Sequence, residues 1–258
     1  MATFETLEVS VQGAIGHMAL ARPKRLNALS RQTLQDLAQA SRWFDEQRDV
    51  KVVVVSGQGS SFCAGFDLND FMNPDPEWGV RESADLGRRM AEAVTNMNAL
   101  TIASIHGNCI GGGVVLAASC DLRVATYSAN FVIPEVDLGI PLAWGGIPRL
   151  VREIGPAATK ELVLTCRPFG SDEAKSLGFL NTIVAEAELD NHVQALAESL
   201  AAKPGYSLRT TKQQVNAVTE EMIGTARNAN DADSLVIATY DAESRAASAA
   251  YLKSKKKG

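Results

Sequence analysis

Residues 101–113 read Thr-Ile-Ala-Ser-Ile-His-Gly-Asn-Cys-Ile-Gly-Gly-Gly, and their pattern is the strongest indication of the fold class. The apolar, β-branched run Thr101–Ile105 predicts a buried strand, and the glycines after it predict a tight corner before a helix. Glycine at the opening of a helix lets a ligand approach the backbone and leaves N–H groups free. These N–H groups, with the helix dipole behind them, favour negative charge. We therefore expect an anion-binding corner at Gly111–Gly113.

Three kinds of anion could use such a corner. A dinucleotide-binding loop follows the first strand and has an acidic residue about 20 positions later, whereas Gly111–Gly113 lies mid-chain and lacks that residue. A triphosphate-binding loop ends in Lys-Ser or Lys-Thr, which does not follow here. An oxyanion formed during catalysis needs only two convergent N–H groups. The oxyanion fits best, and close packing of a helix on a sheet is the structural alternative.

Comparable patterns flank the corner. Lys51–Ser56 is a second predicted buried strand, and it leads into Ser61-Phe-Cys-Ala-Gly-Phe-Asp67. The other expected elements are strands at residues 7–11, 16–21 and 121–125, a helix capped by Ser30, helices at 83–97 and 116–120, an irregular segment at 69–83, and a polar helical region from residue 189 onward. This order of elements predicts an α/β protein.

Composition excludes several classes of protein. The chain has 258 residues, 46% hydrophobic and 21% charged, which is typical of a folded globular domain. Its 25 basic and 30 acidic residues leave a charge of −5, which argues against a nucleic-acid partner. The four cysteines lack metal-ligand spacing, so we expect buried thiols and no metal site. The sequence shows no signal peptide or spanning segment, so we expect a cytoplasmic protein with no membrane partner.

A carboxylate follows the glycine corner, within Phe131-Val-Ile-Pro-Glu-Val-Asp-Leu-Gly139. Glu135 stands among apolar neighbours after a proline that restricts the local backbone. Partial desolvation would raise the pKa of this carboxyl group, which suits proton transfer near neutral pH. A solvated glutamate at the end of an element is the alternative that the sequence leaves open.

These motifs, in this order and spacing, resemble the enoyl-CoA hydratase/isomerase (crotonase) superfamily. The segments that carry the resemblance are Arg22–Leu29, Gly57–Asp67, Ile105–Gly113 and Pro134–Gly139. The resemblance extends from about residue 7 to residue 184, and the helical C-terminus is compatible with it. It implies a crotonase-like spiral of repeated ββα units at residues 1–195 and a helical trimerisation region at residues 196–258. The implied assembly is a homotrimer or a dimer of trimers.

The same resemblance implies an acyl-CoA thioester as substrate, without a separate cofactor or metal, and an enolate held in an oxyanion hole. By motif position, the two amides of the hole belong to Phe66 and Gly112, and one such donor contributes on the order of 3 kcal/mol. The CoA phosphates and adenine are expected beside Lys24, Arg25 and a backbone segment. That segment comprises Ala64, Gly65, Phe66, Asp67 and Leu68.

One position departs from the family's hydratases, which carry two glutamates. Glu135 matches the second glutamate, but the first falls at Val115, and valine cannot hold a catalytic water. A single base is enough to move a proton from carbon 2 to carbon 4 of a 3-enoyl-CoA. The family's 3-enoyl-CoA isomerases are also similar at Leu138-Gly-Ile140 and Trp144. Dienoyl-CoA isomerases use a further aspartate, which here is Ala143.

The sequence therefore predicts a 3-enoyl-CoA to 2-enoyl-CoA isomerase of fatty-acid or related acyl-CoA metabolism, with Glu135 as its proton shuttle. Two alternatives stay open. An enoyl-CoA hydratase could take a second acid from Asp70, Asp137 or the 69–83 segment. A non-catalytic acyl-CoA-binding homologue would keep the oxyanion corner without the chemistry.

Overall fold

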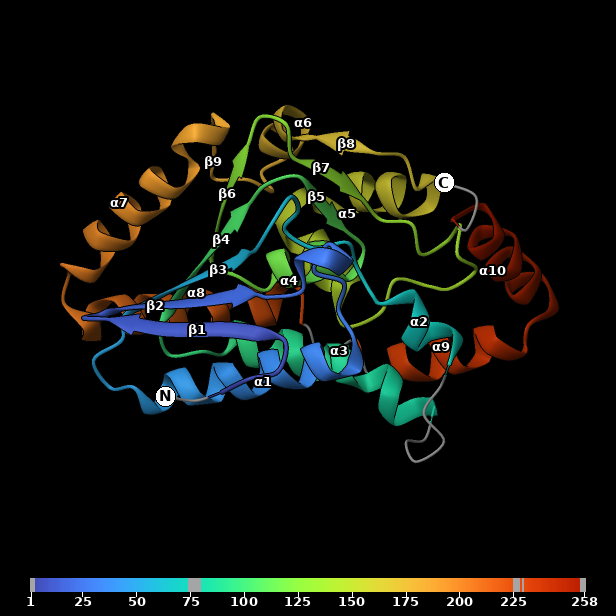
Figure 1. The fold of residues 1–258 in the computed structure, drawn as a ribbon, viewed down its shortest axis with the longest axis horizontal. Coiled ribbons are helices and arrows are strands. Elements are labelled where there is room, and N and C mark those ends of the chain that lie inside the picture. The colour runs from blue at the N-terminus through green and yellow to red at the C-terminus, as the bar shows by residue number, and fades with distance from the viewer. Residues whose placement is uncertain (1–2, 74–79, 225–227, 229, 256–258) are drawn as a thin grey trace.

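A six-stranded sheet forms the main layer of the computed structural model, which describes residues 3–73, 80–224, 228 and 230–255 (Figure 1). Its strands, in spatial order, are β1 (Leu7–Gln12), β2 (Ile15–Leu20), β3 (Val52–Gly57), β4 (Leu100–Ile105), β6 (Leu122–Thr126) and β9 (Thr182–Val184). β1 runs antiparallel to β2, and the other neighbours are parallel. The predicted strands all lie in this sheet.

A second, smaller sheet is built from short strands that the sequence analysis missed. They are β5 (Asn108–Ile110), β7 (Asn130–Val132) and β8 (Phe169–Gly170). β5 is parallel to β7, and β8 is antiparallel to β7. A bridge between Cys63 and Cys109 joins this sheet to the segment that follows β3. Strands of two or three residues carry too little pattern for sequence periodicity to reveal them.

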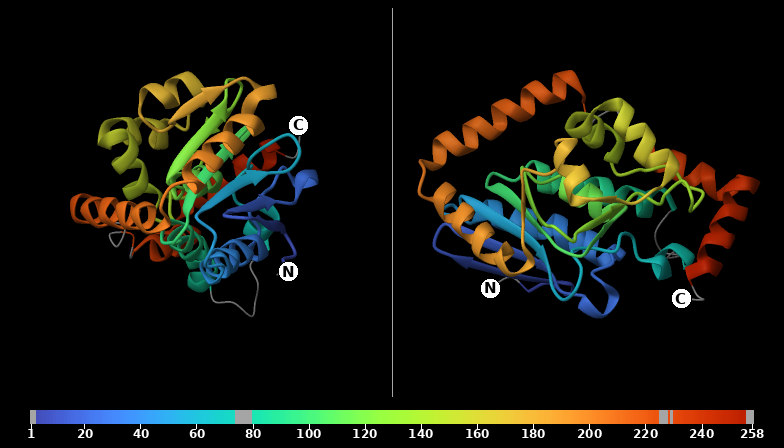
Figure 2. Two further views of the ribbon diagram at one scale, coloured as in Figure 1. Left: turned by 90° about the vertical axis from the view of Figure 1, so that its left-hand side faces the viewer. Right: turned by 90° about the horizontal axis from the view of Figure 1, so that it is seen from above.

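Helices cover the main sheet and extend beyond it. They are α1 (Arg31–Glu46), α2 (Leu68–Met72), α3 (Val80–Thr95), α4 (Gly112–Ala118), α5 (Gly146–Thr165), α6 (Ser171–Ser176), α7 (Leu189–Ala201), α8 (Gly205–Met222), α9 (Asp231–Tyr240) and α10 (Ala242–Lys255). α1 and α3 lie side by side, and α9 packs against α3 (Figure 1). α8 and α10 lie on the outside of the molecule (Figure 2).

The alternation of side chains along β3 divides the core in two. Val53 and Val55 belong to the large cluster that includes residues of α1, α3 and α4. Val52 and Val54 face the other way, into a smaller cluster with Val193 of α7. Burial of one valine side chain contributes roughly 1.5–3 kcal/mol. A strand buried on both faces explains the uninterrupted valine run.

The structure confirms some predicted boundaries and corrects others. Ser30 caps α1, and its side chain accepts a hydrogen bond from the Thr33 N–H at 3.1 Å. The segment predicted to be irregular at 69–83 contains most of α2, which Asp67 caps through the Asn69 N–H. α3 begins at residue 80, not 83, and α4 begins at Gly112, not at 116. The prolines and glycines near these sites concealed the helix starts.

All four cysteines are free and buried, as predicted. Within the described ranges, no helix is long and apolar enough to cross a membrane. The expected division between residues 195 and 196 falls inside α7, whose Val193 and Ala197 both pack against the sheet. The two-part division of the chain stays a prediction.

Candidate active site

The predicted oxyanion corner forms where two glycine-containing segments meet. A β-carbon on Gly65 would lie 2.9 Å from the Ile110 carbonyl oxygen and 3.8 Å from the Gly112 nitrogen. Leu29 holds the first segment, because its N–H donates to the Gly65 carbonyl (2.8 Å) and its carbonyl accepts from the Asp67 N–H (3.0 Å). The Phe66 amide lies between those two bonds.

Both predicted amides are available as donors. The N–H groups of Phe66 and Gly112 donate to no acceptor in the described part of the chain. The Gly112 amide is free because the first N–H groups of a helix have no intrahelical partner. Gly111, with φ of +49°, provides the turn from β5 into α4. The corner thus presents two unused donors from neighbouring segments.

Glu135 directs its carboxylate to this corner. A turn after β7 holds its backbone, with the Ile140 N–H donating to the Glu135 carbonyl at 2.9 Å. A β-carbon on Gly111 would overlap Oε1 of Glu135, so the carboxylate lies directly against that glycine. Oε2 is buried and has no hydrogen-bond partner among the described residues. Burial raises the pKa of Glu135 from 4.5 to about 7.

The position of the family's other glutamate is filled by an aliphatic side chain. Val115 is buried, and its Cγ2 lies 3.0 Å from where a β-carbon on Gly146 would stand. Asp70, one of the suggested replacement acids, accepts a hydrogen bond from the Arg31 N–H at 2.7 Å. Asp137 is exposed. Within the 69–83 segment, residues 74–79 lie outside the described residues.

The predicted CoA-side residues come together at a short 3-10 helix over Pro23–Arg25. Lys24 and Arg25 are exposed there. The Ala64 N–H donates to the Leu26 carbonyl at 2.9 Å, which places the 64–68 segment beside this helix. Two exposed basic side chains suit a phosphate-bearing ligand. The structure therefore gathers this predicted group on one surface.

Two residues organise this surface in ways that sequence reasoning did not assign. Arg22 forms an ion pair with Asp67 at 2.9 Å, which neutralises a carboxylate that would repel phosphate. Asn27 is buried in the left-handed region with φ of +56°, and its Nδ2 donates to the carbonyls of Gln58 and Ser61. Asparagine tolerates this backbone region, so Asn after Leu26 was the available signal.

Tyr251 is a further residue that sequence reasoning missed. It lies on α10, three residues after Ser248, whose Oγ donates to the Leu138 carbonyl at 2.5 Å. Burial, with the negative charges of Glu135 and Asp137, raises the pKa of the Tyr251 hydroxyl. The sequence analysis expected the C-terminal region to mediate assembly, and no local motif linked Tyr251 to the site.

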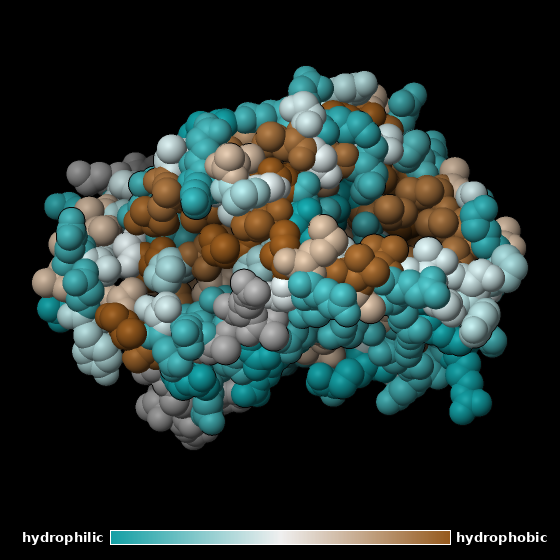
Figure 3. Space-filling view, turned by 180° about the vertical axis from the view of Figure 1, so that it is seen from behind, coloured by the Kyte–Doolittle hydropathy of each residue, from teal (hydrophilic) through white to brown (hydrophobic). Residues whose placement is uncertain are grey.

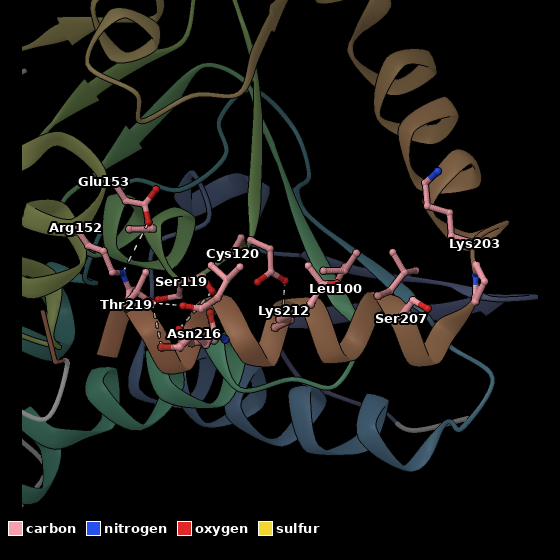
Figure 4. A pocket seen from close by; sticks show the side chains of 17 residues that line it. Leu100, Ser119, Cys120, Arg152, Glu153, Lys203, Ser207, Lys212, Asn216 and Thr219 are labelled. Atoms are coloured by element: carbon pink, nitrogen blue, oxygen red, sulfur yellow. Dashed lines mark hydrogen bonds and ion pairs between the residues drawn. The ribbon is translucent and has the colours of Figure 1, made fainter. Parts of the chain in front are cut away.

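A large groove lies away from this corner. It has a volume of about 620 Å³, and α8 runs along it with Lys212 among its lining residues (Figure 4). Lys212 is paired with Asp121 at 2.8 Å and also donates to the Ala99 carbonyl. None of the predicted site residues lines this groove. Because the predicted base and amides lie at the glycine corner, we place the chemistry there.

The fold and this corner are those of an α/β protein with a candidate oxyanion site, and the comparisons give the family. A family model described as enoyl-CoA hydratase/isomerase matches residues 10–257. The chain belongs to this family, within the crotonase superfamily. It is therefore an enzyme of the isomerase or hydratase kind.

Named relatives and solved structures agree with that membership. The chain is 35% identical over 227 residues to an Arabidopsis thaliana peroxisomal Delta(3,5)-Delta(2,4)-dienoyl-CoA isomerase, covering 82% of each protein. It is 32% identical over 240 residues to a Syntrophomonas wolfei crotonyl-CoA hydratase, covering 92% of each. A crystal structure of an enoyl-CoA hydratase/isomerase from Pseudoalteromonas atlantica superposes with a TM-score of 0.88 at 25% identity, over 97% of this chain and 98% of that one. These relatives include both reaction types.

Proposed function

We propose that the chain isomerises 3-enoyl-CoA thioesters to 2-enoyl-CoA thioesters, with Glu135 as the single proton shuttle. The observation that carries this proposal is the buried carboxylate of Glu135, unpartnered at Oε2 in the described structure, beside the two unused amides. A pKa of about 7 lets the group both accept and return a proton near neutral pH. Val115 is buried at the position that matches the first glutamate of the family's hydratases, so one acid remains where they have two.

The reaction needs no net consumption of water or protons. The Glu135 carboxylate removes a proton from carbon 2, and the electron pair moves into the thioester carbonyl and the neighbouring double bond. The resulting dienolate oxygen accepts hydrogen bonds from the amides of Phe66 and Gly112. Protonated Glu135 then returns the proton to carbon 4, which leaves the double bond between carbons 2 and 3. The CoA moiety lies beside Lys24, Arg25 and residues 64–68.

A hydratase is the second candidate, because several relatives carry that name. Hydration requires a water held by a second acid, and Val115 offers no hydrogen bond to it. Asp70 already accepts a hydrogen bond from the Arg31 N–H, which argues against Asp70 as the second acid. The isomerase is therefore the function that the geometry supports better. A non-catalytic acyl-CoA binder would need no base with a pKa near neutrality.

Three assays on one purified protein separate these candidates. Incubation with a 3-enoyl-CoA tests isomerisation, followed by the ultraviolet absorbance of the conjugated 2-enoyl product. Incubation with crotonyl-CoA tests hydration through the loss of the same absorbance. Calorimetric binding of a saturated acyl-CoA tests recognition without chemistry. Isomerisation that Glu135→Gln abolishes supports the proposal, whereas hydration alone or binding alone rejects it.

We further propose that the chain assembles as a homotrimer or a dimer of trimers through its helical C-terminal region, residues 196–258. Four large apolar side chains on α8 are more than half exposed, namely Tyr206, Val215, Val218 and Met222. Apolar side chains also gather across the face seen in Figure 3. Exposed apolar surface of this kind marks interaction sites. Light scattering coupled to size-exclusion chromatography gives the molar mass, and a monomeric mass rejects this assembly.

A further inference from the structure

The indole of Trp144 touches both segments that carry the proposed amides. A β-carbon on Gly112 would overlap the ring, and the Phe66 ring stands edge-on to it with centroids 5.6 Å apart. On another side, a β-carbon on Gly87 of α3 would also overlap the indole. Close packing of this kind transmits small displacements. A shift of the indole therefore changes the surface against which Phe66 and Gly112 are packed.

The backbone at Trp144 adopts a conformation that bulky residues rarely take. Its φ is +61°, and Gly145 follows with φ of +68°. For a tryptophan, a left-handed backbone is an outlier that persists only where the surroundings hold it in place. The position of the indole thus depends on whatever holds this turn.

Two charged residues hold the turn from opposite sides of Gly145. Asp231, the first residue of α9, accepts a hydrogen bond from the Gly145 N–H at 2.8 Å. Arg149 donates to the Gly145 carbonyl at 3.1 Å and to the Trp144 carbonyl at 3.4 Å. Arg149 is fully buried and forms no ion pair within 4 Å in the described structure. Burial lowers the pKa of the Arg149 guanidinium to about 10, and the nearby Asp231 carboxylate opposes that shift.

We propose that Asp231 is a positioning residue for the reaction, because its hydrogen bond to Gly145 fixes the left-handed turn at Trp144 and thereby the alignment of the two amides. This inference rests on the proposed function. Oxyanion donors act mainly in the transition state, so misalignment lowers kcat. The expected CoA contacts at Lys24 and Arg25 are untouched, so KM changes little.

The chain offers a matched control on the same helix. Asp233 also lies in the first turn of α9, but its side chain is half-exposed and pairs with Arg81 at 2.7 Å. Removing either aspartate costs the helix the same kind of favourable charge at its N-terminus. Of these two aspartates, Asp231 accepts a hydrogen bond from the Gly145 N–H, whereas Asp233 pairs with Arg81. A difference between the two variants therefore reports the turn and not the helix dipole.

The test compares Asp231→Ala, Asp231→Asn and Asp233→Ala in kcat, KM and tryptophan fluorescence. Fluorescence is read in a background with Trp43→Phe and Trp78→Phe, so that Trp144 is the sole reporter. For Asp231→Ala we expect kcat to fall about tenfold or more with KM within threefold, and the emission to shift to the red with stronger acrylamide quenching. Asp231→Asn keeps an acceptor and should restore most of kcat, and Asp233→Ala should match the parent.

Equal kcat in Asp231→Ala and the parent overturns the inference, even if fluorescence changes. A fall in kcat of similar size in Asp233→Ala also overturns the inference. Should Asp231→Ala fail to fold, Asp231→Ser replaces it, because the shorter hydroxyl does not reach the Gly145 amide. A parent protein without turnover rejects the proposed function instead. In that case unchanged emission and quenching of Trp144 in the Asp231 variant overturns this inference separately.

Discussion

The carboxylate of Glu135 occupies the space that a side chain on Gly111 would fill. This relationship joins the proposed base to the start of α4, where the Gly112 N–H donates to no acceptor in the described part of the chain. Glycine at 111 therefore serves two purposes, since φ of +49° also requires it. Glu135 and the Gly112 amide can lie next to each other because Gly111 has no side chain.

Replacing Gly111 by alanine should displace the carboxylate. We expect Gly111→Ala to lower kcat on the order of 100-fold, because a base moved by about 1 Å loses its alignment. Gly13→Ala is the control, since Gly13 also has positive φ (+59°) but no atom lies within 4 Å of its built β-carbon. Both variants should lose stability through the backbone, and only Gly111→Ala should lose activity. Equal kinetics in the two variants would contradict this expectation.

The pH dependence of turnover should report Glu135. The base must be ionised to accept a proton, and burial raises its pKa to about 7. We therefore expect kcat/KM to rise with pH and to level off above about pH 7, with the midpoint near that pKa. The measurement is a pH profile of isomerisation at low substrate concentration. A profile that is flat between pH 5 and 8 speaks against Glu135 as the base.

The same shift predicts a pH-dependent stability. Native Glu135 binds its proton more tightly than in the unfolded chain, so its contribution is fully present below pH 4.5 and is lost as the pH rises to about 7. Glu135→Gln removes this dependence, so relative to wild type it should gain up to about 3 kcal/mol between pH 4 and pH 8. Urea unfolding of both proteins at the two pH values measures the gain. If the difference in unfolding free energy between the two proteins is the same at pH 4 and pH 8, Glu135 is not desolvated.

Gly87 should be intolerant of substitution despite its place in a helix. Alanine usually stabilises a helix relative to glycine by about 1 kcal/mol. At Gly87 the added carbon would overlap the Trp144 indole, so we expect Gly87→Ala to lower both the melting temperature and kcat. Gly205→Ala in α8 is the matched helical control, because its new contact with Lys51 would be an ordinary 3.4 Å. A Gly87→Ala protein as stable and active as the Gly205→Ala protein would refute the expectation.

The basic pair at the short 3-10 helix should govern affinity. We expect Lys24→Ala combined with Arg25→Ala to raise KM for acyl-CoA several-fold with little change in kcat, because the pair contacts the non-reacting part of the substrate. The effect should shrink at high salt, which screens exposed charges. Arg42→Ala on α1 removes another exposed charge and is the control. A fall in kcat without a change in KM would place the CoA moiety elsewhere.

The local sequence pattern correctly predicted the elements that short-range features determine. The valine run of β3 and the cap at Ser30 were both read correctly, since burial on two faces and a capping hydroxyl leave direct signals. The short strands β5, β7 and β8 and the helix α2 were missed. Their formation depends on partners distant in the chain, such as Cys63 beside Cys109, and no residue pattern records those pairings.

The site shows the same limit. Motif spacing singled out Glu135, Phe66 and Gly112, and the structure brings them to one corner. The contact of Trp144 with Gly87 and the bond from Asp231 to Gly145 were not predictable, because they join segments 57 and 86 residues apart through tertiary packing. Positioning residues of this kind have no sequence motif of their own.

Deuterium exchange at carbon 2 of a bound acyl-CoA is the decisive measurement for this mechanism, because it requires both a base and an enolate-stabilising hole. The wild-type protein is incubated with a saturated acyl-CoA and a 3-enoyl-CoA in heavy water, and label is located by NMR and mass spectrometry. We expect label at carbon 2 of the saturated thioester, transfer of the carbon 2 proton to carbon 4 of the 3-enoyl-CoA, and neither with Glu135→Gln. Binding of the saturated thioester without exchange, binding of the 3-enoyl-CoA without isomerisation, or exchange that persists in Glu135→Gln, would contradict the mechanism.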